Sequence, residues 1–144
     1  TAASQRPMSW YEKAFDTNLK TKWIFGVDGL PEESCMYRIN QDGEKLYNIM
    51  KDSVKYLNKT PIWQMIVFKF NENDIEKTKN MANDIGVKFV VINSSRWIGD
   101  NDPLRPTDKN LSLNLKDKGK ITTKFGGLHE FRFLNENDLK RIKK

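Results

Sequence analysis

The sequence predicts an α/β fold built on parallel strands. Three apolar runs, rich in β-branched and aromatic residues, each stop abruptly at polar residues or glycine: Lys22–Val27, Ile62–Phe70 and Lys88–Ile92. Amphipathic helical patterns fill the gaps between these runs. Strands separated by helices favour parallel pairing through crossover connections, with the loops at the strand ends available for a site.

A short helix and the first strand are expected at the start of the chain. Ser9 and Glu12 have the spacing of a capping box, so a helix should begin there and run to about Leu19. Lys22–Val27 should form a strand, because Trp, Ile, Phe and Val suit a pleated surface. Gly29 then interrupts the pattern and predicts a loop.

Two further helices are predicted between the strands. The clearest one covers Asp42–Asn58, where the apolar residues recur at the spacing of one helix face. They are Leu46, Ile49, Met50, Val54 and Leu57. The next helix is expected from an N-cap at Asn73 to Ile85, and Gly86 is placed to end it in a left-handed conformation.

Beyond Trp97 the pattern weakens into a basic extension. Residues 105–144 carry 11 Lys+Arg against 5 Asp+Glu, while residues 1–104 carry 14 of each, so the net charge of +6 lies in the extension. We divide the chain into a β/α unit over residues 1–97 and a basic extension over residues 98–144. In the extension, residues 111–115 and 121–125 are candidate strands and residues 134–142 a candidate helix. Such a tail attracts phosphate-bearing partners or is simply a solvated end.

Composition and motifs exclude several classes of protein. The longest apolar runs, such as Met65–Phe68, are too short to span a bilayer, so we expect a cytoplasmic protein without a membrane partner. The single cysteine, Cys35, rules out an internal disulfide and is interpreted as a packing residue rather than a reactive thiol. The sequence has no glycine-rich phosphate loop, and His129 has no second ligand nearby for a metal.

Polar residues gather where the predicted strands end. The carboxyl ends of parallel strands meet at one edge of a sheet, and ligands bind there. We therefore expect a shared cavity mouth at this edge. The candidate site residues are Gly26, Asp28, Arg38, Asn71, Ser94 and Ser95. Taken singly, each is an ordinary loop or cap residue, and only their convergence favours a site.

The order of these motifs resembles the radical S-adenosylmethionine (radical SAM) enzyme family. Phe25–Leu30, with the sequence FGVDGL, is similar to the end of the fourth strand of that family's partial (β/α) barrel. The Tyr37-Arg38 pair and the amphipathic helix follow in the family's order. Four other segments resemble, in turn, the ends of the third, fifth and sixth strands and the helix after the fifth: Thr1–Arg6, Phe68–Glu72, Ser94–Trp97 and Met81–Val87.

This resemblance implies that residues 1–97 are half of a TIM-like barrel, in a fragment of an enzyme that cleaves SAM at a 4Fe–4S cluster. The deoxyadenosyl radical so formed would abstract hydrogen from an unknown substrate. The N-terminal half of the barrel, or a partner supplying it, would complete the fold. Gly26 and Asp28 would face the ribose or methionine part of SAM, and Arg38 would face its carboxylate or the substrate. Asn71 and Ser94–Ser95 would border the cavity.

The sequence departs from the family at the cluster. The family binds the cluster through three cysteines of a CxxxCxxC motif, and this chain has only Cys35, so we expect no activity from these residues alone. Two alternatives stay open. One is a non-catalytic α/β binding module that engages nucleic acid or another polyanion through the basic tail, and the other is a degenerate half-barrel kept for partner assembly. A half-barrel also predicts an open inner face, where Phe25, Val67 or their neighbours would meet water.

Overall fold

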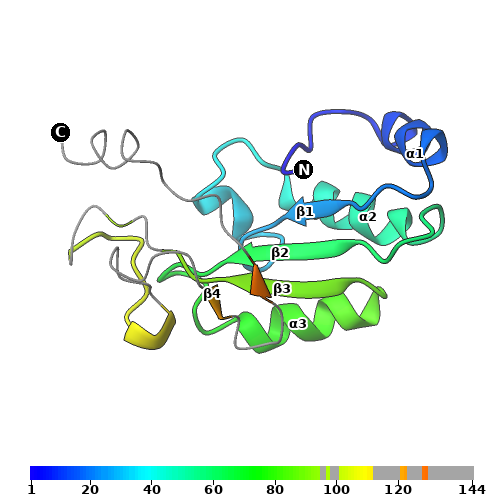
Figure 1. Cartoon of the computed structure of the whole chain (residues 1–144). Helices are drawn as coiled ribbons and strands as arrows, with labels where there is room; N and C mark the ends of the chain where they lie inside the picture. The colour runs from blue at the N-terminus through cyan, green and yellow to red at the C-terminus, as the bar shows by residue number, and fades with distance from the viewer. Residues whose placement is uncertain (95–96, 98–100, 112–120, 123–127, 130–144) are drawn as a thin grey trace, which may run out of the picture.

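A computed structural model describes residues 1–94, 97, 101–111, 121–122 and 128–129. At its centre lies a sheet of three parallel strands: β1 (Ile24–Gly26), β2 (Ile62–Ile66) and β3 (Lys88–Ile92). The strands are adjacent in sequence order, with β2 in the middle (Figure 1). The predicted parallel sheet is confirmed, although β1 and β2 are shorter than the apolar runs that predicted them.

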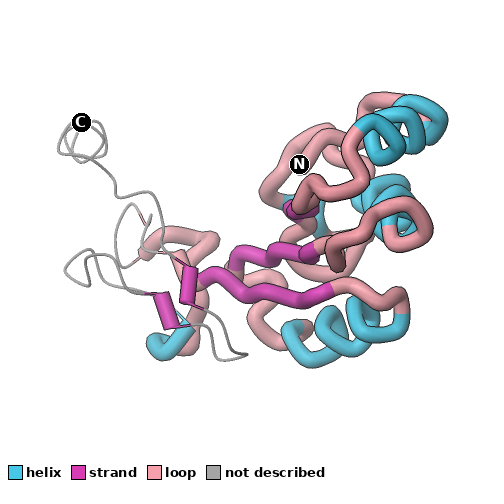
Figure 2. The backbone as a smooth tube through the Cα atoms, turned by 45° about the vertical axis from the view of Figure 1, so that its right-hand side comes forward, coloured by secondary structure: helices cyan, strands magenta, loops and turns pink. Residues whose placement is uncertain are grey.

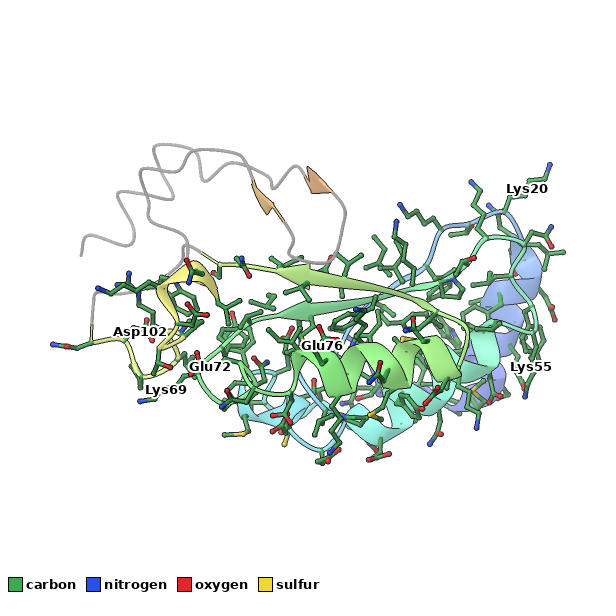
Figure 3. The ribbon with its side chains drawn as sticks, turned by 90° about the horizontal axis from the view of Figure 1, so that it is seen from below. Lys20, Lys55, Lys69, Glu72, Glu76 and Asp102 are labelled. Carbon is green, nitrogen blue, oxygen red and sulfur yellow. The ribbon has the colours of Figure 1, made fainter. Side chains whose placement is uncertain are left out.

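Three α-helices cover one face of this sheet: α1 (Met8–Thr17), α2 (Gly43–Ser53) and α3 (Ile75–Asp84). Figure 3, seen from below, shows all three on the same side of the strands, as successive crossovers of one hand require. The antiparallel pair β4 (Ile121–Thr122) and β5 (Leu128–His129) lies on the opposite side. No helix within the described residues has the length and apolar character that crossing a bilayer requires.

Side-chain alternation divides the sheet between a helix-covered face and a helix-free face. The residues that pack toward the helices are Phe25, Val27, Trp63, Met65, Val67, Phe89 and Val91. The helix-free face carries a smaller apolar cluster of Ile62, Val90 and Ile92, with Ile24 and Ile66 packed against it. The expectation that Phe25 and Val67 meet water is therefore wrong. Both are 0% exposed, because their positions in the alternation send them toward the helices.

Two of the predicted helix starts are wrong. Helix α1 begins at Met8 and not at Ser9, with an extended Pro7 as its N-cap and no side-chain capping bond. Because Pro7 already directs the chain into the helix, Ser9 lies inside the first turn and cannot cap it. Helix α3 begins at Ile75, with Asp74 instead of Asn73 at the N-cap, again without a side-chain bond.

Individual residues account for the start of α2 and for the end of α3. The Asp42 side chain accepts a hydrogen bond from the Lys45 backbone N–H at 2.9 Å, which caps α2 at its predicted start. The helix ends at Ser53, short of the predicted Asn58. After α3, Gly86 has φ +74°, which confirms its left-handed role.

Several predictions fall in loops or in the extension. Cys35 is exposed and does not pack inside, because it lies in the short 3₁₀ helix η1 (Ser34–Met36) at the surface. Leu111 belongs to a second 3₁₀ helix, η2 (Lys109–Leu111), and not to a strand. The strand at Ile121–Thr122 pairs with Leu128–His129. Residues 112–120, 123–127 and 130–144 lie outside the described part of the chain, and so does the predicted helix over 134–142.

Close packing at the start of α2 yields a stability prediction. A Cβ at Gly43 would lie 1.9 Å from the Pro31 carbonyl oxygen, and that backbone atom cannot move aside cheaply. We expect Gly43→Ala to lower the free energy of unfolding by about 1–3 kcal/mol, as overpacking does. Urea denaturation measures this, with the exposed neighbour Glu44→Ala as the control. Equal stability of the two variants would contradict the prediction.

Candidate functional site

The hydrogen-bond ladder between β1 and β2 gives way to side-chain bonds at the carboxyl edge of the sheet. The Val27 N–H still donates to the Gln64 carbonyl at 3.2 Å. Beyond it, the Val27 carbonyl accepts from the Trp63 indole Nε1 at 2.9 Å, and the Ile66 N–H donates to Asp28 Oδ1 at 2.8 Å. Because buried backbone groups must be paired, these two side chains replace the missing ladder bonds. The Asp28 carboxylate thus lies between the ends of the two strands.

Asp28 also holds an arginine. Its Oδ2 accepts from Arg38 Nε at 2.7 Å, and the aspartate side chain is 0% exposed while that of Arg38 is 25% exposed. Burial raises the pKa of the Asp28 carboxyl, and the Arg38 charge and the Ile66 hydrogen bond oppose this rise. With both oxygens occupied and no exposed surface, Asp28 orients Arg38 and does not itself meet a ligand.

The Arg38 guanidinium lies over Gly26 on the helix-free face. The neighbours of Gly26 along β1, Phe25 and Val27, face the helices, so a side chain at position 26 would point the other way. A Cβ there would lie 3.1 Å from Arg38 Nη2 and 3.3 Å from its Cζ. The glycine therefore leaves room for the guanidinium to rest on the strand.

The terminal nitrogens of Arg38 remain available. Its side chain donates through Nε to Asp28, and neither Nη group makes a hydrogen bond to any residue that the structure describes. A guanidinium fixed through Nε presents its two Nη groups as a planar fork, which matches a carboxylate or a phosphate. Of the predicted site residues, Arg38 is the one equipped to contact an anion.

The loop that carries Arg38 is held by a buried polar network. Ser34 Oγ accepts from the Asp28 N–H at 3.2 Å and donates to Gln41 Oε1. The Gln41 amide in turn donates to the carbonyls of Gly26 at 3.1 Å and Ala2 at 2.7 Å. Ser34 and Gln41 were not among the predicted site residues, because nothing in their spacing distinguishes them from other polar loop residues. Together they fix the loop and hence the position of Arg38.

Asn71 is a structural residue of the same edge. It is 0% exposed, and its Oδ1 accepts from the Phe68 N–H at 2.8 Å while its Nδ2 donates to the Ile66 carbonyl at 3.0 Å. Ile66 is therefore bound by Asp28 on its N–H and by Asn71 on its carbonyl, which links the loops after β1 and β2. Asn71 cannot reach a ligand without leaving these bonds.

The third strand contributes less to the described site. Ser94 follows β3 at the same edge and is half-buried, and Ser95 lies outside the described residues. Aromatic contacts connect the three loops: the Phe68 ring lies 4.3 Å from Tyr37 and 6.1 Å from Trp97, measured between centroids. The structure thus brings Gly26, Asp28 and Arg38 into direct proximity, with Asn71 behind them as a support.

Residues 101–111 form a strap that packs against the loop after β2. The Lys69 N–H donates to the Leu104 carbonyl at 2.9 Å. The Glu72 carboxylate accepts from the backbone N–H groups of Thr107 at 2.8 Å and Asp108 at 3.3 Å, and also from the Thr107 hydroxyl. Leu111, at the end of the strap, is buried in the main core. Figures 2 and 3 show this strap at the carboxyl edge of the sheet.

No metal centre is found in this part of the protein. No three His, Cys, Asp or Glu side chains come close enough together to hold an ion within the described residues. The lone thiol, Cys35, does not meet the requirement of a 4Fe–4S cluster for several cysteine ligands. Comparison with family models, with curated proteins and with solved structures finds no match for this chain.

The buried carboxyl of Asp28 predicts a pH dependence. Its pKa is raised in the folded protein, so its contribution to stability is fully present below the unfolded pKa and is lost as the pH rises through the folded pKa. The unfolding free energy of the wild type, relative to Asp28→Asn, should therefore fall as the pH rises above the ordinary aspartate pKa of about 4. Urea denaturation at a series of pH values on both sides of this pKa measures it. A relative stability that increases with pH would mean that the Arg38 charge outweighs burial.

The Glu72 contacts predict how the strap is held. Glu72→Ala removes the acceptor of three hydrogen bonds, so we expect a loss of about 1–3 kcal/mol in unfolding free energy. The amides of Thr107 and Asp108 should also exchange faster with solvent. The control is Glu76→Ala, which removes an exposed pair with Lys79, of a kind worth about 0–1 kcal/mol. Unchanged exchange at Thr107 in Glu72→Ala would refute the assignment.

Proposed function

We propose that this chain is part of the barrel of a radical SAM enzyme and contributes one side of its SAM and substrate cavity. The observation that carries the proposal is the Arg38 fork. It is held by buried Asp28 over Gly26, at the carboxyl edge of a parallel sheet. An oriented, partly exposed guanidinium at this edge suits the carboxylate of SAM or of a substrate.

The topology is compatible with a barrel segment. Three parallel strands follow one another in sequence order, and their helices lie on one face, as in a closed β/α barrel. The outer edge of β1 is also paired in the parallel manner: Thr1 N donates to the Ile24 carbonyl, and the Gly26 N–H donates to the Thr1 carbonyl at 2.7 Å. In this proposal the remaining strands, from the same protein or from a partner, would pair along this edge.

The described residues have a limited part in the chemistry. When bound to its cluster, SAM would supply a deoxyadenosyl radical, and the cluster ligands must come from elsewhere. Arg38 binds the carboxylate, Asp28 fixes the guanidinium through Nε, and Gly26 leaves the space that the guanidinium occupies. Asn71 supports the edge from behind through Ile66.

One observation favours a second candidate function. The whole excess of positive charge lies in residues 105–144, as expected of a binding module for nucleic acid or another polyanion. Such binding would weaken steeply with salt and would not depend on Arg38. Titration with single-stranded and duplex nucleic acid at two salt concentrations separates this function from the first.

The test of the proposed function is isothermal titration of SAM into the protein. We expect weak binding, because these residues lack the cluster. Arg38→Gln should weaken it about tenfold, or about 1.4 kcal/mol. The control is Arg6→Gln, which removes the same charge at an exposed position beside Trp10. The absence of SAM binding, or binding that Arg38→Gln leaves unchanged, would defeat the proposal.

A further inference from the structure

A second polar side chain lies beside the Arg38 fork. Gln64 is the register partner of Gly26 on β2, and paired strands lie about 4.8 Å apart. Its neighbours along the strand, Trp63 and Met65, face the helices, so Gln64 projects from the helix-free face, on the same side as the guanidinium. It is half-buried, and its carboxamide forms no hydrogen bond with the described part of the chain.

The surroundings of Gln64 on this face are apolar. Ile62 and Ile66 flank it along β2, and Val90 is its register partner on β3. Ile24 lies beside Ile62 on the same face. A carboxamide in such a setting gains from a ligand that accepts or donates a hydrogen bond, since aliphatic neighbours offer none. Ile62 and Val90 are buried, whereas Ile24 and Ile66 are half-buried and can offer a ligand apolar contact.

We propose that Arg38 and Gln64 form one binding seat for a carboxylate on a short aliphatic stem. The Arg38 fork takes the two carboxylate oxygens, and the Gln64 amide donates to one of them. The stem lies against the half-buried side chains of Ile24 and Ile66 on the helix-free face. The inference rests on the proposed function only in sharing Arg38, and it adds the class of ligand that this site recognises.

Charge distinguishes a carboxylate from a phosphate at this seat. The Arg38 charge is balanced by that of Asp28 when the acid is ionised, and Gln64 is neutral. The Thr1 ammonium is close enough to Arg38 for the two charges to repel, and it donates to the Ile24 carbonyl. Lys88, in the same row as Ile24 and Ile62, lies at the amino end of β3, away from the fork. One guanidinium with its counterion nearby suits a planar monoanion better than a phosphate dianion, which is commonly bound by several cations or backbone N–H groups.

The experiment is an NMR titration of the protein with butyrate, using butyramide as the neutral analogue of the same size. We expect butyrate to bind in the millimolar range, to shift the Gly26 amide and the Gln64 side-chain amide, and to bind at least about tenfold more tightly than butyramide. Gln64→Leu, which suits the apolar face, should weaken butyrate about 2–10-fold, as the loss of one hydrogen bond does. Arg38→Gln should abolish binding, and Arg6→Gln should leave it unchanged.

Three results would overturn the seat: equal affinity for butyrate and butyramide, tighter binding of inorganic phosphate than of butyrate, or no effect of Gln64→Leu. Arg38→Lys guards against a folding defect in Arg38→Gln, since it keeps the charge but loses the fork and should still weaken butyrate. Butyrate binding without SAM binding would contradict the proposed function but support the carboxylate seat. If SAM binds equally well to Gln64→Leu and butyrate does not bind at all, the carboxylate seat is contradicted and the proposed function is supported.

Discussion

The Asp28 carboxylate is the interaction on which the carboxyl edge of this sheet depends. It accepts the Ile66 N–H where a ladder bond would otherwise run, and with its other oxygen it fixes Arg38. This buried side chain thus links the end of the β1–β2 ladder to the direction of the guanidinium, while Ser34 and Gln41 hold the loop between them. Asn71 then binds the carbonyl of the same Ile66, so the second loop is tied to the first.

The strands were predictable from the sequence because burial on both faces leaves an unmistakable apolar run. Lys88–Ile92 was predicted at its observed bounds, and the helix starting beside Asp42 was marked by a side chain that does cap it. Helix starts without a capping bond were not predictable in this way. Helices α1 and α3 begin after Pro7 and Asp74, and neither residue makes a side-chain capping bond. The capping-box spacing at Ser9 therefore predicted a bond that does not form.

The site was predictable only as a gathering of polar residues at strand ends. Asn71 and Arg38 look equally suitable in the sequence. In the structure, both ends of the Asn71 amide bond to backbone groups, whereas the Nη groups of Arg38 bond to none of the described residues. That difference depends on which atoms each side chain reaches in the fold, such as the Asp28 carboxylate that holds Arg38 and also binds Ile66, 38 residues away along the chain. Gln64 was not predicted as a site residue for another reason. Gln64 lies inside an apolar run, and only the alternation of the strand places its side chain on the helix-free face. Its role in the proposed site depends on Gly26, its register partner on β1.

The energetics of the Asp28–Arg38 pair are consistent with the anion site proposed for this edge. Burying a carboxylate is costly, and the raised pKa of Asp28 shows that its partners do not fully offset the cost. Apolar residues of similar volume commonly replace such pairs without loss of stability, so stability alone gives little reason to keep it. What the pair does provide is a guanidinium of fixed orientation over Gly26, with two Nη groups that bond to no residue in the described part of the chain. Donors held in that way are what the proposed anion site requires.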